Sequence, residues 1–410
     1  MGQVRWARWM VGLAMALAVC GVRPATADIR SDQAAAILEW PSVIFIEEDF
    51  IFQTGFVLET LIQLSNVSNE PVRAWCFYEN ANAHCSNTGE VCVFAEECCS
   101  LEFGCGTCDP GWNETDFFIN LTPNQPLGWL ASNGMSGFDV SSRPPKDFGE
   151  FPIDGVTNFG NDGTSSNAGS RIPPVPEEPF NGSLRCIAVD EDGIPVDRNV
   201  LKGEATIIIF GEDEGPGGQD VLSVAKHNAI GVQAIEGAVN DDKVLCLGGE
   251  PSDQCPDGAE YNGCPNFMIL NHFFDFAENP VTDDGSFIVT LLTLVPCTQD
   301  FLRQIPGETV VQYVVYNEFE QRVSASRKVV CKSLIQLSNI DTTQNERSIF
   351  SAGVAGTLTG QSRLNPLTSG VFAVATEVHI PAGDFEVPPI ADFNVHYQGD
   401  RAESDIITLP

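Results

Sequence analysis

Six cysteines crowd into one short stretch of the chain, with the spacing C-x6-C-x5-CC-x5-C-x2-C. Gly, Asn, Ser and Glu surround them and apolar residues are few, so burial alone cannot hold this stretch in shape. Disulfides are therefore expected, each contributing about 3 kcal/mol for a short loop, and the spacing does not choose among the many ways of pairing six thiols. The six are Cys85, Cys92, Cys98, Cys99, Cys105 and Cys108.

Two other chemistries fit parts of the same stretch. The thiolates of Cys98, Cys99, Cys105 and Cys108, with the imidazole of His84, have residue types that suit a tetrahedral zinc site. The C-G-T-C sequence from Cys105 to Cys108 also has the spacing of a redox pair, although it opens no helix after a strand. Structural disulfides are the preferred interpretation, because the start of the chain points to an oxidising compartment.

The first 27 residues have the pattern of a signal peptide. Arg5 and Arg8 precede an uncharged apolar run over residues 11–19, and a small-x-small motif ends at Ala27. Cleavage after this residue predicts a protein that is secreted or held at the cell surface, periplasmic or extracellular. Lipoprotein processing at Cys20 is a minor alternative that would anchor the protein to a membrane. No later run is long and apolar enough to predict a transmembrane span.

Removal of this segment leaves 13 of the 14 cysteines, so at least one thiol is expected to be free or bound to another chain. Cys297 and Cys331 each end a strand-like run, and we predict a bridge between them. Cys76 and Cys186 lie inside apolar strand patterns, where they either pair or supply the odd thiol. A second stapled loop is predicted from the remaining three, Cys246, Cys255 and Cys264.

Acidic residues dominate the charge. The formal net charge is -35, and it becomes -38 once the three arginines of the signal peptide are removed. Nucleic acid is therefore not expected as a partner, because phosphate binding needs a basic surface. Acidic turns at strand ends are a better match to calcium, which prefers several oxygen ligands. The weak calcium candidates are Asp190, Asp192, Asp283 and Asp284, and no other cofactor is predicted.

The sequence motifs that announce common enzyme classes are absent: it has no G-x-S-x-G elbow, no HExxH helix and no phosphate-binding glycine loop. His272 is expected to be structural rather than a ligand or a base. Glu318 and Glu320 alternate along a predicted strand, so both are expected on one solvated face. Trp75 is expected in the core, whereas Trp112 follows the Cys-rich stretch in a turn and is the candidate contact residue for a protein or a glycan.

Strands must position these residues. Short runs rich in Val, Ile, Phe, Tyr and Thr, bounded by Gly, Pro, Asn and Asp, recur along the chain and favour antiparallel sheets. Only residues 221–237 show a helix-like pattern, with Asp220 as its N-cap and Gly231 interrupting it. The clearest predicted strands span residues 60–64, 72–78, 117–121, 184–189, 205–210, 287–295, 309–316, 333–337 and 371–376.

The predicted fold class is all-β, with two immunoglobulin-like antiparallel β-sandwich units, long loops and a disulfide-rich insertion. The first unit spans residues 28–210, with the Cys-rich insert at 84–110 and a long loop at 141–183. Residues 211–285 form a connector with the short helix and the Cys-containing loop, and residues 286–410 form the second unit. One larger β-domain with insertions is the alternative.

These features predict an exported, non-enzymatic protein that acts at a cell surface, in adhesion, or as an extracellular structural or binding protein. The step from fold class to adhesion is an analogy, since sandwiches host many functions. The alternative is a secreted carbohydrate-active hydrolase or glycan-binding module with an acidic and aromatic site built by loops. The partner, a protein or a glycan, is not specified by the sequence.

Overall fold

A computed structural model describes residues 32–46, 56–92, 98–100, 104–135, 172–212, 219–238, 242–280, 285–382 and 388–410. The predicted signal peptide with Cys20, residues 141–171 of the predicted long loop, Asp283 and Asp284 lie outside these residues. Within them the chain is all-β, with antiparallel sheets and several disulfides, as predicted. Every strand predicted above is present. The division into two immunoglobulin-like units stays a prediction.

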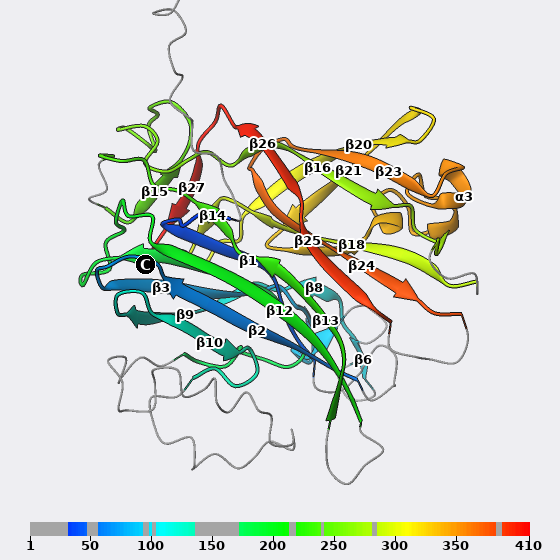
Figure 1. Cartoon of the computed structure of the whole chain (residues 1–410), viewed down its shortest axis with the longest axis horizontal. Coiled ribbons are helices and arrows are strands. Elements are labelled where there is room, and N and C mark those ends of the chain that lie inside the picture. Colours follow the sequence, from blue (N-terminus) through cyan, green and yellow to red (C-terminus); the bar gives the residue numbers. More distant parts are fainter. Residues whose placement is uncertain are drawn as a thin grey trace, which may run out of the picture.

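Two sheets built from the first half of the chain face each other (Figure 1). Their core contains Trp40, Tyr78 and Trp129, and the indole of Trp129 donates a 2.7 Å hydrogen bond to the Tyr78 hydroxyl. Sheet A has the order β14 (Ile230–Val232), β1 (Ile37–Phe45), β11 (Phe180–Val189), β3 (Val72–Asn80) and β9 (Asn113–Leu121). Sheet B has the order β10 (Pro126–Leu130), β2 (Val57–Asn66), β12 (Leu201–Glu212) and β13 (Gln219–Asn228).

Local sequence explains how these strands pair. The register of β1 against β11 shifts between Trp40 and Val43, and this irregularity accommodates Pro41, which cannot donate to the sheet. Gly203 of β12 leaves room for the buried indole of Trp40, because a Cβ atom at Gly203 would lie 2.2 Å from Trp40 Cζ2. Cys76 and Cys186 face each other on neighbouring strands of sheet A and form a disulfide.

The predicted helix at residues 221–237 is wrong. Residues 219–228 form β13, which pairs with β12 along its length, and residues 230–232 form β14 at the edge of sheet A. The exposed Lys226 lies between Ala225 and His227, which are both buried, so the side chains alternate as in a strand. Pairing with the buried β12 therefore overrides the weak helical spacing of the apolar residues.

Two more sheets come from the second half of the chain and enclose their own core, which contains Tyr313, Phe350 and Leu364. Sheet C has the order β21 (Arg322–Val330), β20 (Glu308–Asn317), β23 (Thr359–Pro366), β16 (Pro265–Phe273) and β26 (His396–Asp400). Sheet D has the order β17 (Ala277–Glu278), β18 (Phe287–Pro296), β24 (Val371–Ile380) and β25 (Ile390–Asn394), and β22 (Ser333–Gln336) also pairs with β18.

The helices in the described residues are short: the 3-10 turns η3 (Leu337–Asn339) and η4 (Asn345–Arg347), and α3 (Ala352–Ala355). Among the described residues, no helix is long and apolar enough to cross a membrane.

A third core lies on the outer face of sheet A, so this sheet is covered on both sides. Phe77 of β3 stacks on Phe301 with ring centroids 4.1 Å apart, and Phe372 of β24 and Ile407 belong to the same apolar cluster. The C-terminal strand runs back to this core, as Figure 1 shows by the position of the C-terminus. A small sheet covers it, with the order β15 (Val244–Leu247), β27 (Asp405–Thr408) and β19 (Gln299–Asp300).

The edges of sheets B and D also meet. Strands β13 and β25 lie side by side without a regular ladder. Instead, the Asn394 side chain accepts a 3.1 Å hydrogen bond from the Asn228 backbone N–H and donates one of 2.8 Å to the Asn228 carbonyl. Ser223 Oγ accepts a 3.2 Å bond from the Ile390 backbone N–H. Side chains therefore join two sheets that come from opposite halves of the chain.

Candidate functional site

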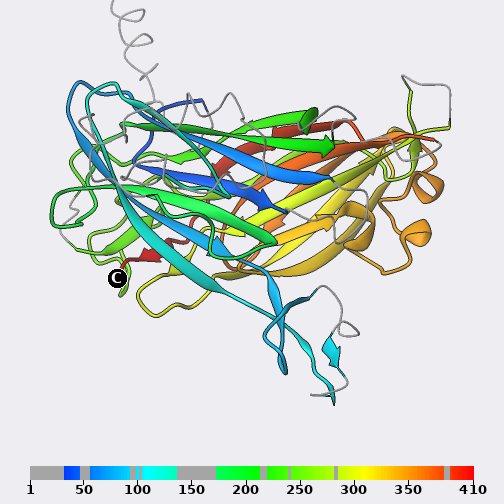
Figure 2. The ribbon, with the colours of Figure 1, turned by 90° about the horizontal axis from the view of Figure 1, so that it is seen from below.

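The Cys-rich stretch is the far end of the β3–β9 hairpin, and it projects from the body of the molecule (Figure 2). Its short strands are β4 (Ala83–Cys85), β5 (Val91–Cys92), β6 (Cys99–Ser100), β7 (Gly104–Cys105) and β8 (Cys108–Pro110). Its disulfides are Cys85–Cys98, Cys92–Cys108 and Cys99–Cys105. We call residues 83–110 the stapled projection.

The disulfides bear directly on the zinc and redox alternatives. All six sulfur atoms are bonded in pairs, so the thiolates that a zinc site would need are consumed. Cys105 and Cys108, the predicted redox pair, bond to Cys99 and Cys92 instead of to each other. His84 contacts a carboxylate. The stapled projection is therefore built as a disulfide framework.

One carboxylate anchors the base of the stapled projection. Glu177 Oε1 accepts hydrogen bonds from Asn80 Nδ2 at 2.6 Å and Asn82 Nδ2 at 2.5 Å, and Glu177 Oε2 lies 3.0 Å from His84 Nε2. Burial raises the pKa of the Glu177 carboxyl, but the bonds from Asn80, His84 and Asn82 outweigh it and lower that pKa below its ordinary value. The ionised carboxylate thus ties the projection to the segment that precedes β11.

Trp112, the predicted contact residue, lies where the stapled projection joins β9. Its side chain is partly buried and packs against the third core. Much of the indole therefore serves packing, and a role as a contact residue stays a prediction.

The structure describes two of the calcium candidates, Asp190 and Asp192, and both lie in the turn that follows β11. Asp190 Oδ1 accepts 2.9 Å hydrogen bonds from the backbone N–H groups of Asp192 and Ile194, and Gly193 takes the left-handed conformation that this turn needs. Asp192 is exposed. The structure therefore explains Asp190 as a turn residue, and calcium binding stays a prediction.

Strand β9 carries a group of acidic and aromatic residues that sequence reasoning missed. Asp116 Oδ2 accepts a 3.0 Å hydrogen bond from the indole of Trp75, which stacks on Phe118 with ring centroids 4.8 Å apart. Burial, and then the neighbouring Asp116, raise the pKa of Glu114 to about 7. Glu114 and Asp116 are two residues apart on one strand, so both point to the outer face of sheet A. The alternating E-T-D sequence was the available signal.

The histidine and the paired glutamates singled out in the sequence have structural roles. Buried His272 is a residue of β16, and its Nδ1 donates to the Phe273 carbonyl, while its Nε2 lies 2.8 Å from the Oγ atom of Ser362 on β23. Burial lowers its pKa to about 4, so it is neutral at pH 7. Glu318 and Glu320 lie beyond the end of β20 in the turn to β21, rather than on a strand face, and Glu318 accepts two bonds from Thr359.

The predicted Cys297–Cys331 bridge is wrong. Cys297 bonds to Cys264, while Cys331 is a free, buried thiol whose Sγ lies 3.9 Å from the Asn80 carbonyl oxygen. Both predicted strand ends exist, but the chain turns after β18 toward the loop that carries Cys264. The predicted three-cysteine loop holds one internal bond, Cys246–Cys255.

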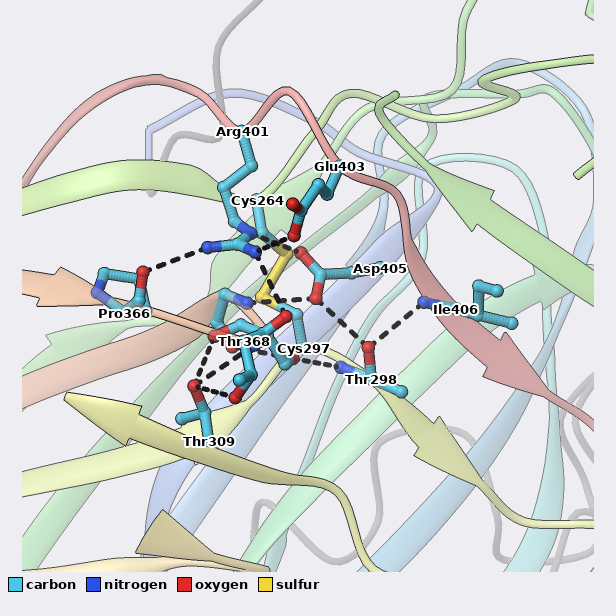
Figure 3. Close-up of polar contacts among 12 residues, drawn as sticks. Cys264, Cys297, Thr298, Thr309, Pro366, Thr368, Arg401, Glu403, Asp405 and Ile406 are labelled. Carbon is cyan, nitrogen blue, oxygen red and sulfur yellow. Dashed lines mark hydrogen bonds and ion pairs between the residues drawn. A yellow bond between two sulfur atoms is a disulfide. The ribbon is translucent and has the colours of Figure 1, made fainter. Parts of the chain in front are cut away.

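The Cys264–Cys297 disulfide belongs to a polar clamp on the C-terminal strand (Figure 3). Asp405 Oδ1 accepts bonds from Thr298 Oγ1 at 3.1 Å and from the Gly370 N–H at 2.9 Å, and Asp405 Oδ2 lies 3.4 Å from Arg401 Nε. Burial raises the Asp405 pKa above its ordinary value. Sulfur and carboxylate atoms meet here, but the sulfurs are bonded to each other, so the clamp fastens β27.

A second group that the sequence did not reveal is a buried charge cluster on the outer face of sheet A. Arg185 Nε lies 2.6 Å from Glu39 Oε2 and 3.6 Å from Glu79 Oε1, and all three side chains are fully buried. The guanidinium also donates to the carbonyls of Pro296 and Cys297, each at 3.1 Å. Charged residues inside strands are easily assigned to a solvated face, and only the covering segment from the second half buries them.

Comparison with models of known protein families gave no match, and no curated protein matched this sequence either.

Proposed function

We propose that this chain is an exported, non-enzymatic protein of the cell surface or extracellular space that binds a protein or glycan partner through the stapled projection. The observation that supports the proposal most is the hairpin of Figure 2, which extends beyond the body and whose exposed end is held by three disulfides. A projecting segment that contributes little to the main cores, yet is held in one shape, is preorganised for recognition.

Disulfides also support the proposed location. Six are present among the described residues, and such bonds persist in oxidising compartments. The free Cys331 is buried, so it offers no exposed thiol. The signal-peptide pattern of residues 1–27 agrees with export.

Shortening the hairpin tests the proposal. Asn80 and Asn113 are directly paired, so an Asn-Gly turn in place of residues 81–112 closes the hairpin in register. We expect this variant to fold, and to lose binding to intact cells or extracellular material of the source organism. A Glu308→Gln variant is the control that should keep binding, because it changes an exposed residue of β20 and leaves the projection in place. Unchanged binding by the shortened protein would contradict the proposal.

A second candidate function is glycan hydrolysis or glycan binding at Glu114 and Asp116. The Cα atoms of residues at alternate positions of a strand are about 6.6 Å apart, and this spacing allows a carboxyl separation of the size that inverting glycosidases use. Glu114, whose pKa is raised, would act as the acid, and the exposed Asp116 would act as the base. Against this candidate, Trp75 is only 5% exposed, so little of its ring can stack on a sugar.

Reducing-sugar release from a panel of polysaccharides separates the two candidates. The first candidate expects no release from the full chain. Release that is lost in Glu114→Gln but kept in the shortened hairpin would support the second candidate.

A further inference from the structure

Two buried carboxylates share a single guanidinium in the charge cluster. Arg185 forms its close ion pair with Glu39 at 2.6 Å, whereas Glu79 Oε1 lies 3.6 Å away and accepts no hydrogen bond among the described residues. Glu79 Oε2 accepts a 2.5 Å bond from Gln299 Nε2, a neutral donor. Arg185 can balance one of the two negative charges, and the second has no close cation.

Lys332 does not provide the missing partner. Its Nζ donates to Asn181 Oδ1 at 2.7 Å and to the Gly182 carbonyl at 2.5 Å. Burial lowers its pKa to about 7, so much of it is neutral at neutral pH. The remaining titratable groups that interact with the cluster are Glu114 on β9, the Cys331 thiol and Tyr397 on β26.

We propose that Glu39 and Glu79 hold one proton between them, and that this proton fastens the segment from Pro296 to Gly307 onto the outer face of sheet A. That segment touches the cluster at three points. Arg185 donates to the carbonyls of Pro296 and Cys297, and Gln299 donates to Glu79. Within the segment, Gln299 Oε1 accepts a 2.6 Å bond from the Gly307 N–H, which holds the Gln299 side chain in place. Loss of the proton leaves an unbalanced negative charge under this segment, so the contact is sensitive to pH.

The direction of the pH effect follows from the buried acid. Burial, which outweighs the attraction of Arg185, raises the pKa of Glu79 to about 8 from an ordinary value of 4.5. A group whose pKa is higher in the folded state stabilises the fold fully below its unfolded pKa and loses that effect as the pH rises to the folded value. The contact is therefore firmest in acid and weakens between pH 4.5 and about 8. Lys332 has a lowered pKa, so its contribution to stability rises with pH instead of falling, but only from about pH 7 upward.

A Glu79→Gln variant tests the shared proton, because glutamine has the shape of a protonated glutamate and cannot ionise. Unfolding free energies of wild type and variant are compared from about pH 5 to about pH 7, below the Lys332 window. We expect the unfolding constant of the variant to fall relative to wild type by up to about tenfold per pH unit. The matched control is Glu308→Gln, an exposed acid paired with Lys328, whose curve should run parallel to wild type.

Glu39→Gln provides a second test. It leaves Glu79 as the sole acid beside Arg185, so no proton is needed. We therefore expect its unfolding constant to fall relative to wild type, with rising pH, as in Glu79→Gln. In wild type at pH 7, infrared difference spectra against either variant should contain one protonated carboxyl band. The proposal would be overturned if the unfolding free energies of both variants followed the same pH dependence as wild type, or if the spectra contained no protonated carboxyl band.

Cys331 gives a measurement on the wild type if neither variant folds. Because this buried thiol lies beside the cluster, its alkylation rate should rise more steeply between about pH 5 and about pH 7 than that of a free cysteine peptide. An equal rise would overturn the proposal.

Discussion

His227 Nδ1 lies 3.3 Å from Asp392 Oδ2, and both side chains are fully buried where the edge strands of sheets B and D meet. The other carboxylate oxygen of Asp392 accepts a 2.5 Å bond from Thr376 Oγ1. A strand from residues 219–228 is thereby held against one from residues 390–394, so the two halves of the chain are joined by buried polar contacts as well as by the third core.

Asp392→Ala should lower the free energy of unfolding by about 3 kcal/mol, because it leaves the buried His227 and the half-buried Thr376 without their hydrogen-bond partner. Chemical denaturation measures the change. Glu204→Ala is the control in the same sheet, since it removes a largely solvent-accessible ion pair between β12 and Lys226 of β13 and should cost less than about 1 kcal/mol. Equal losses of unfolding free energy in the two variants would show that the buried contact stabilises the fold no more than the exposed ion pair does.

Glu177→Ala should loosen the stapled projection while leaving the main cores intact. The variant removes the acceptor of Asn80, Asn82 and His84, so amide exchange in β4 should accelerate with little change in the melting temperature. The lowered pKa predicts the same loosening in wild type in acid, because the anchor is lost as the pH falls below the ordinary value of 4.5. Exchange followed by mass spectrometry tests both statements, and unchanged exchange in β4 would refute the anchor.

Cys331 should resist alkylation in the native protein and react once the protein is denatured without reductant. Its side chain is buried, and burial raises its pKa well above the ordinary value, so little thiolate is present. Peptide mapping locates the label. Label found on Cys297 instead would mean that the pairing with Cys264 is incorrect.

Removal of the Cys76–Cys186 disulfide by a double alanine substitution should cost about 4–5 kcal/mol, because this bond closes a long loop in the unfolded chain. The sequence separation is 110 residues, against 9 for Cys246–Cys255, whose removal should cost about 2–3 kcal/mol by the same reasoning. Denaturation curves of the two double variants provide the comparison. A larger loss for the short loop would show that local strain or packing outweighs loop closure.

Much of the fold was predictable because its strands carry their signal locally. The apolar runs within β11, β18 and β24 are bounded by turn residues and lie where expected. The helix at residues 221–237 was wrongly predicted because the apolar residues of this segment lie on different surfaces of the molecule. Val221 and Val224 are exposed on β13, whereas Ile230 and Val232 on β14 are buried in the third core, and a linear pattern cannot separate these roles.

The candidate sites were less predictable because they depend on contacts between distant residues. Glu39, Glu79 and Arg185 come from three strands and become a buried cluster only when residues 296–299 cover them. Disulfide partners have the same dependence: Cys297 pairs with Cys264, 33 residues before it, because β18 and the loop before β16 meet in space. The local Cys-rich stretch was recognisable, since all its partners lie within it.

Ile407 of β27 and Leu409, which follows this strand, are fully or almost fully buried in the third core. Synthesis runs from the N-terminus, so the outer face of sheet A lacks part of its cover until translation has passed β27. The native state of the first half can therefore be completed only long after its own strands have been made. A premature stop codon upstream of β27 would leave an apolar surface open to chaperones, proteases and aggregation.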